Sequence, residues 1–259
     1  MEHIKKLMHL IYAKKRKLTV ISAAAIAVYI ICMVGIFPYS SSWETVSNEL
    51  TIAHNSVAIE EPAWDSTGHD MAGRSEPGMS IPKNPRGVNN GNTDLYIRLT
   101  MTVKTEDFVS ENDSYEQAFS DPDRRLNLIL HALTLSDGTT PLFNMDTSSE
   151  NISKWTIKDT GCNNTRFVLE EDSSQETENQ RVFYFYYKEE NSDNMCVVGT
   201  GESDKKTADL FNYVKIPIYK REYLGVFDQK YSITVQAEGI PVMGTQPLTV
   251  RQAKDKFNS

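Results

Sequence analysis

The pattern of apolar and polar residues changes once along this chain of 259 residues, at about residue 40. Residues 18–37 form an apolar run without a charged side chain, LTVISAAAIAVYIICMVGIF. A helix rises about 1.5 Å per residue, so a helix over this run could cross a bilayer core of about 30 Å. Beyond the run, apolar and polar residues alternate in short stretches that turn residues separate, which is typical of strands. The pattern predicts an N-terminal hydrophobic helix within residues 1–42 and a strand-rich domain over residues 43–259.

Two stretches of the second region carry the strongest strand signals. Apolar residues alternate from Leu95 to Val103, and five consecutive aromatic residues, Phe183–Tyr187, predict a strand in the centre of a sheet. Residues 126–135 fit the helix and strand periods equally poorly, and we favour a strand. Residues 65–79 predict a loop, and the tail 248–257 a short amphipathic helix. The other expected strands lie within residues 47–62, 155–157, 167–169, 206–219 and 231–242.

The frequent turns and the scarcity of helix decide the expected fold class. A parallel sheet would need helices between its strands, and the pattern does not supply them. The sequence therefore predicts an all-β fold, an antiparallel β-sandwich of jelly-roll or Greek-key type, behind the N-terminal signal or anchor helix.

Charge separates the same two regions. Residues 1–17 hold six of the 27 Lys and Arg residues but one of the 35 acids, so the remainder is strongly acidic. An acidic body repels nucleic acid, which argues against a nucleic-acid partner. The basic cluster should stay on the cytoplasmic side of a membrane, which predicts export of the domain that follows.

The apolar run has two possible interpretations, a cleaved signal peptide and an uncleaved membrane anchor. Ser40, Ser41 and Ser42 follow the run and offer the small side chains that a signal peptidase requires. Cleavage there would release an extracellular protein, whereas an uncleaved segment would anchor the protein to the membrane at the cell surface. The length of the run favours the anchor and the serines favour cleavage, which we prefer.

The exported region offers little recognisable chemistry. Cys162 and Cys196 could form a disulfide or remain two free thiols, because spacing alone does not fix the distance between them. The three histidines of the region, His54, His69 and His131, lack the H-E-x-x-H motif and helical i, i+4 spacing. There is no G-x-S-x-G motif. We therefore predict no enzyme, no cofactor and no metal site.

Three other features have an ordinary structural interpretation. Acidic clusters at residues 107–113, 121–123 and 170–172 could bind calcium, but solvated loops are the favoured interpretation. The aromatic stretch Phe183–Tyr187 could bind glycans or peptides, but a core strand is favoured. Arg98, within a predicted strand, should pair with an acid.

Several segments, in order, resemble a known family. They are the basic leader with its apolar run, IEEPAWD (Ile59–Asp65), EPGMSIPKNPRGVNNGNTDLYIRLTMTV (Glu76–Val103), VFYFYYKEE (182–190), TADLFNYVKIPI (Thr207–Ile218) and ITVQAEGIPV (233–242). Together they resemble the SipW-type, alternate signal-mediated exported proteins of Gram-positive bacteria, the TasA and camelysin group, in its BsaA-like biofilm-matrix branch. The chain departs from the family where Phe37, Pro38 and Tyr39 replace the usual alanine before the cleavage site.

The resemblance implies a jelly-roll protein that polymerises into an extracellular biofilm matrix or fibre. In fibre-forming members the N-terminal strand of one subunit completes a sheet of the next. Here the donor strand would be residues 43–53, with Leu50 and Ile52 as apolar positions, and the partners would be further copies of the chain and a signal peptidase. A membrane-tethered binding or adhesion module is the alternative, and a secreted metalloprotease, as described for some camelysin-like members, is a third.

Overall fold

The computed structural model describes residues 56–74, 76, 78–105, 121–216 and 231–258. All of them belong to one compact unit, Ala53–Ser259. The unit is mostly β-structure, and every strand pair of the described residues is antiparallel. The expectation of an all-β antiparallel fold is confirmed at this level.

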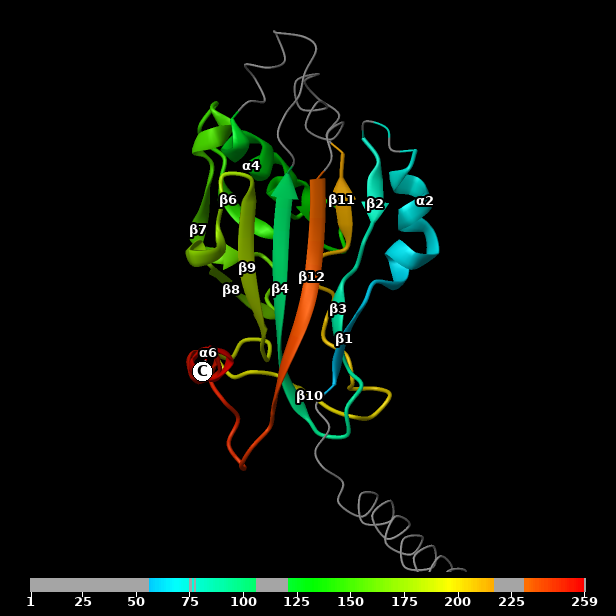
Figure 1. Ribbon diagram of the computed structural model, residues 1–259, viewed down its shortest axis with the longest axis vertical. Helices are drawn as coiled ribbons and strands as arrows, with labels where there is room; N and C mark the ends of the chain where they lie inside the picture. Colours follow the sequence, from blue (N-terminus) through cyan, green and yellow to red (C-terminus); the bar gives the residue numbers. More distant parts are fainter. Residues whose placement is uncertain (1–55, 75, 77, 106–120, 217–230, 259) are drawn as a thin grey trace, which may run out of the picture. The chain divides into compact units, whose positions relative to one another are not determined.

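The main sheet is built around the longest strands (Figure 1). Its order is β12–β4–β9–β8, and the short β10 continues the line of β9 beside β4. The aromatic strand β9 lies between β4 and β8, so the prediction that it is central is confirmed. The strands of this sheet are β4 (Leu95–Thr105), β8 (Phe167–Glu171), β9 (Gln180–Tyr187), β10 (Val197–Val198) and β12 (Tyr231–Pro241).

A second layer consists of short strands that hydrogen bonds link side by side. The pairs are β1–β3, β2–β11–β5 and β6–β7. A bridge from Val88 to Lys206 and a bond from the Leu142 N–H to the Leu133 carbonyl connect these pairs. The strands are β1 (Val57–Glu60), β2 (Ser80–Pro82), β3 (Arg86–Asn89), β5 (Leu133–Thr134), β6 (Phe143–Asp146), β7 (Thr156–Cys162) and β11 (Tyr213–Lys215).

The core lies between the two layers. Phe143 from the second layer stacks on Phe183 of β9, with ring centroids 4.8 Å apart. The inward residues Leu99 and Met101 of β4 and Phe185 of β9 are fully buried. Burial of large aromatic and aliphatic side chains at about 25 cal/mol per Å² is the main force that holds the layers together.

Helix α4 (Pro122–Ala132) corrects the strand predicted at 126–135. The Asp121 carboxylate caps it by accepting from the Asp123 N–H, and Pro122 occupies the first turn. Arg125, Leu126, Leu128, Ile129, Leu130 and Ala132 are all buried. The helix is buried almost all round, so its sequence lacks the one-sided apolar stripe that would have identified it.

The loop predicted at residues 65–79 is also partly wrong. It contains the π-helical turn η1 (Trp64–Gly68) and the short helix α2 (His69–Ala72). Two 3₁₀ turns, η2 (Ile152–Lys154) and η3 (Ser173–Gln175), complete the short helical segments of the described chain.

Helix α6 (Val250–Phe257) confirms the predicted amphipathic tail and covers part of the outer face of the main sheet. Beneath it, the guanidinium of Arg98 lies 4.7 Å from the Phe257 ring and 4.3 Å from the Tyr184 ring. Arg98 Nη2 pairs with Glu238 Oε2 at 2.5 Å, which confirms the predicted acidic partner. The outer face of the sheet is thus closed here by a C-terminal element.

No helix in the described part of the chain is long and apolar enough to cross a membrane. The apolar run at residues 18–37 lies outside the described residues.

Candidate functional site

The two layers are joined on one side, which we call the closed side. The turn at residues 163–166 leads from β7 in the second layer to β8 in the main sheet. The Asn163 N–H donates to the Leu142 carbonyl in the second layer, and the Arg166 carbonyl accepts from the Lys188 N–H beyond β9. Backbone hydrogen bonds to both layers therefore hold this side together.

On the opposite side, the layers face each other along a seam between β12 and strands β1 and β2. The lower part of this seam is filled. Gly239 of β12 lies so close to Val57 of β1 that a β-carbon at Gly239 would be 2.6 Å from Val57 Cγ2. The absence of a side chain at Gly239 allows β1 to close the seam at this level.

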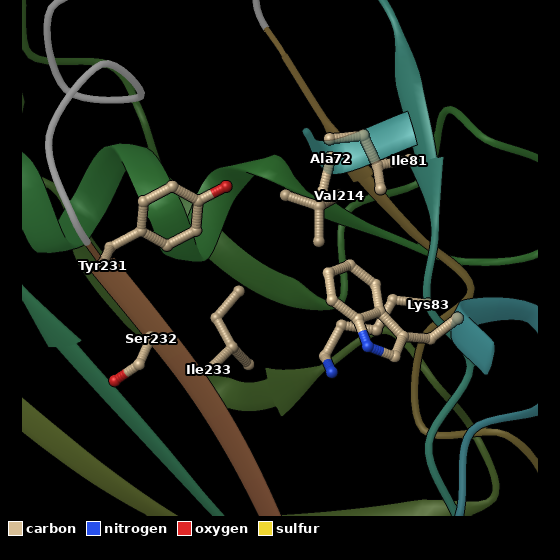
Figure 2. A pocket seen from close by; sticks show the side chains of 8 residues that line it. Ala72, Ile81, Lys83, Val214, Tyr231, Ser232 and Ile233 are labelled. Atoms are coloured by element: carbon tan, nitrogen blue, oxygen red, sulfur yellow. The ribbon is translucent and has the colours of Figure 1, made fainter. Parts of the chain in front are cut away.

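The upper part of the seam is a groove with a volume of about 380 Å³. Figure 2 shows Tyr231, Ser232 and Ile233 of β12 on one side of it and Ile81 and Lys83 on the other. The described residues that line it are Trp64, Ala72, Ile81, Lys83, Val214, Tyr231, Ser232 and Ile233. The lining is mainly aliphatic and aromatic, so the groove favours apolar occupants.

Strand β12 directs the backbone groups of its odd-numbered residues toward this seam. The Val242 N–H donates to the carbonyl of Asp94, the residue that precedes β4. From there each residue of β12 lies opposite one residue of β4 without a shift in register. In an antiparallel ladder alternate residues bond the same neighbour. Even-numbered residues of β12 therefore bond β4, while Ile233, Val235 and Ala237 direct their N–H and C=O groups away from it. Within the described ranges, no strand pairs with β12 on that side.

The wall opposite β12 is held by a partly buried ion pair. Lys83 Nζ lies 2.6 Å from Glu61 Oε2 and 4.8 Å from the centroid of the Trp64 ring. The Lys83 side chain is 11% exposed and the Glu61 side chain 17% exposed. The ammonium is thus neutralised by a carboxylate and an aromatic face, and the groove carries no uncompensated charge at this wall.

A glycine fixes η1 against β2. A β-carbon at Gly68 would lie 2.1 Å from the Pro82 carbonyl oxygen. The Ala63 N–H also donates to Asn84 Oδ1 at 2.7 Å. These contacts place Trp64 over the groove and cover the side of β2 that faces away from β11.

Electrostatics in the groove agree with an apolar site. Burial raises the pKa of the Tyr231 phenol at the start of β12, so this group is neutral at physiological pH. The arrangement offers an apolar groove beside Ile233, Val235 and Ala237, whose outward peptide groups no described strand pairs. That combination can bind an extended segment by backbone hydrogen bonds and alternate apolar side chains.

The cysteines of the predicted pair are free thiols in this structure. Cys162 Sγ accepts from the Asn164 N–H at 3.3 Å, and burial raises the pKa of its thiol to about 12. Cys196 Sγ instead accepts from Arg166 Nη2 at 3.4 Å. Of the two alternatives for this pair, the structure has the unpaired thiols.

The predicted histidines are not brought together. His69 is exposed on α2 and packs against the edge of the Trp64 ring, whereas His131 lies on α4 next to Trp155. Burial and the nearby Lys215 lower the pKa of His131. His54 lies outside the described residues. Within the part of the chain that the structure describes, no group of three or more His, Cys, Asp or Glu could hold a metal ion.

The acidic clusters have structural roles where they are described. Asp121 caps α4, Asp172 caps η3, and Asp123 and Glu170 form ion pairs with Arg181 and Lys254. Residues 107–113 lie outside the described residues.

The aromatic strand lies within the fold. Phe183 and Phe185 are fully buried on the inner face, and Tyr186 is buried on the outer face under α6. The favoured interpretation, a core strand, is therefore confirmed.

The remaining predicted site residues, Ser40, Ser41, Ser42, Leu50 and Ile52, lie outside the described residues. The groove itself was missed by the sequence analysis. Its residues come from four separate segments, and none of them forms a motif. Pro82 and Pro85 are a weak sequence signal for one wall of the groove, because proline cannot donate to a ladder and is confined to the edges of sheets.

The fold and groove of the described residues define a class of protein: a two-layered antiparallel β-protein, closed on one side, with an apolar groove beside the edge strand β12 on the other. Neither protein-family models nor curated proteins gave a match to this chain.

Proposed function

We propose that this chain is an exported structural protein, a subunit of an extracellular biofilm matrix or fibre, held outside the cell or at its surface. Subunits join when the N-terminal strand of one copy completes the main sheet of another. The proposal includes the finer fold assignment, a β-sandwich of jelly-roll type, which the two-layered antiparallel arrangement supports without distinguishing it from other sandwiches.

The unpaired side of β12 next to the groove is the observation that carries the proposal. An exposed strand edge is a template for another strand, and proteins that stay monomeric usually cover it or break it with charges. The backbone groups of Ile233, Val235 and Ala237 point toward the seam, and the groove beside them is apolar. Both properties are those of a strand acceptor.

The sequence before β1 supplies a candidate donor. Residues 43–53 contain Leu50 and Ile52 at alternate positions, as a strand with one apolar face requires. The segment ends four residues before β1 begins at Val57. Signal-peptidase cleavage near Ser40–Ser42 would free its N-terminal end.

The test compares a chain that begins at residue 43 with one that begins at residue 54. Sedimentation and electron microscopy should show a ladder of large species for the longer chain and a monomer for the shorter. An Ala72→Arg variant of the longer chain should also stay monomeric, because the new side chain would occupy the groove. Thr67→Arg is the matched control, since Thr67 is exposed on the same helical segment but does not line the groove.

Strict monomers from both chains at all concentrations would contradict the proposal. Mass spectrometry of the native N terminus adds a second check. A protein that retains residues 1–42 and remains monomeric would instead be the membrane-tethered binding or adhesion module.

A further inference from the structure

Asn90 and Gly91 form the only Asn–Gly pair in the sequence. Such a pair is open to a spontaneous reaction, because glycine has no β-carbon to keep its peptide nitrogen away from the preceding asparagine side chain. The pair lies in the turn between β3 and β4, and Asn90 is exposed. The turn therefore contains the reacting groups of a deamidation that needs only water.

The deamidation balances without any other reagent. The Gly91 nitrogen loses its proton to solvent and attacks Cγ of Asn90, and the side-chain amide nitrogen takes up a proton and leaves as ammonia. Water then opens the resulting cyclic succinimide at either carbonyl, which gives aspartate or isoaspartate. Both products carry a new negative charge, and isoaspartate also adds a carbon to the main chain between residues 90 and 91.

The folded chain restrains the nitrogen that must attack. The Gly91 N–H donates to Asn89 Oδ1 at 2.9 Å. The Asn90 N–H donates to the Ser56 carbonyl at 2.8 Å, so the peptide on the other side of Asn90 is held as well. Ring closure requires the Gly91 N–H to leave its acceptor, since this N–H cannot stay bonded to Asn89 and also lose its proton to solvent.

The side chain of Asn89 is itself fixed in one orientation. Asn89 is 2% exposed, and its Nδ2 lies 2.8 Å from the Thr93 carbonyl oxygen. The same nitrogen lies 3.0 Å from the carbonyl oxygens of Val198 and Gly199. A side-chain amide nitrogen donates hydrogen bonds, whereas the amide oxygen only accepts them. Rotation of the amide would place its oxygen against these carbonyl oxygens, so Oδ1 must face Gly91.

We propose that Asn90 is a deamidation site and that the buried side chain of Asn89 protects it in the folded protein. The protection lasts while β3, the turn and the chain at residues 198–199 remain packed, because these segments hold Asn89 in place. When they separate, the Gly91 nitrogen is released, and the loss of ammonia makes the change irreversible. The extent of deamidation at Asn90 therefore reports how often this turn opens.

Peptide mapping by mass spectrometry tests the proposal on the full chain, kept for several weeks at pH 8. Replacement of the amide by a carboxyl raises the mass of the peptide that contains Asn90, and chromatography separates the isoaspartate form. We expect Asn90 to deamidate at least about tenfold more slowly in the native protein than in the same chain unfolded in guanidinium chloride, an effect that one net hydrogen bond can supply. Asn89→Ala should remove most of this difference.

Asn164→Ala is the matched control for Asn89→Ala. Like Asn89, Asn164 accepts through Oδ1 from the N–H two residues later, which here belongs to Arg166 at 3.1 Å. Its Nδ2 also donates to backbone carbonyls, those of Asp209 and Leu210. Loss of Asn164 should therefore weaken the fold in a similar way but leave the deamidation rate of Asn90 unchanged.

Equal rates in the parent and Asn89→Ala would overturn the inference, and so would a native rate as fast as the unfolded one. An equal increase in Asn164→Ala would attribute the effect to general destabilisation and overturn it as well. If Asn89→Ala does not fold, hydrogen exchange of the Gly91 amide in the parent decides the question, because a persistent bond to Asn89 must protect this N–H. Exchange as fast as in an unfolded chain would contradict the proposal, whereas slow exchange together with slow deamidation would support it.

Discussion

Strands β2 and β12 face the same seam from opposite layers, and only one of them is covered. On β2, the chain from Trp64 to Ala72 folds into η1 and α2 against the side that β11 does not use (Figure 1). On β12, no described strand pairs with the side of Ile233, Val235 and Ala237 that faces away from β4. The difference between the two strands, within the described residues, is that helical turns cover the edge of β2 and not this side of β12.

The comparison shows that helical turns can protect the edge of a strand when no further strand pairs with it. Three kinds of contact hold η1 and α2 against β2. They are the close approach of Gly68 to β2, the hydrogen bond from the Ala63 N–H to Asn84, and the ion pair of Lys83 with Glu61. Natural proteins cover strand edges in this manner to prevent unwanted pairing. An edge that is left open beside an apolar groove, in the same molecule, is consistent with an edge reserved for pairing.

The largest expected effect comes from removing the cover of β2. Gly68→Ala would place a β-carbon 2.1 Å from the Pro82 oxygen, which belongs to the backbone and cannot move independently. We expect a loss of about 3 kcal/mol in the free energy of unfolding, at the upper end of overpacking effects.

Gly73→Ala is the matched control for this substitution. The nearest atom to a β-carbon at Gly73 is 3.8 Å away, and the residue has a helical φ of −67°. Its unfolding free energy should be unchanged or slightly higher. Urea denaturation of both variants measures the contrast, and equal effects would show that the cover of β2 does not depend on this close approach.

A smaller effect should follow from breaking the ion pair that anchors the cover. Glu61→Gln would leave the Lys83 ammonium partly buried without its carboxylate. We expect a loss of about 2 kcal/mol, less than for a fully buried pair because Glu61 retains some contact with water.

The pair of Lys205 and Glu202 provides the comparison for Glu61→Gln. Its N–O distance is also 2.6 Å, but the Glu202 side chain is 90% exposed. Glu202→Gln should therefore leave the denaturation midpoint essentially unchanged. A similar midpoint for the two variants would mean that the Lys83 pair contributes no more than a surface contact.

The smallest expected effect is a pH dependence of the free energy of unfolding that arises at helix α4. Of the described histidines none lines the groove, but His131 is half-buried on α4, where burial and Lys215 lower its pKa. The folded state then binds a proton less readily than the unfolded state, whose histidine pKa is about 6.5. The stabilising contribution is complete above that pH and is lost as the pH falls through about 6.5 toward the lowered value in the folded state.

Denaturation between pH 8 and pH 5 measures this dependence, and His131→Gln should reduce its slope. His69→Gln is the control, because the His69 side chain is 79% exposed. If the slope were the same in His131→Gln and the parent, the pH dependence would have to arise elsewhere.

Local signals were sufficient for much of the fold. The alternation in β4, the unbroken aromatic run in β9 and the amphipathic pattern of α6 are each strong local signals, and each element was predicted correctly. Helix α4 was not, because burial on all sides removed the period that separates helix from strand. The cap and proline at Asp121 and Pro122 would have identified its beginning.

Local sequence signals of this kind could not identify the candidate site. Trp64, Lys83, Val214 and Ile233 are brought to one groove by strand pairing between distant segments. Which side of β12 is unpaired depends on the order of strands in the sheet, and a single sequence does not contain that order in any local form.

The sequence by itself determined the periods of the long strands β4 and β12 and of the amphipathic helix α6. Only the tertiary structure decided which edge is covered and where Val57 closes the seam against Gly239. Periodicity follows from the geometry of the local backbone, which neighbouring residues specify. Edges and grooves follow from contacts between residues far apart in the chain, and those exist only once the layers have packed.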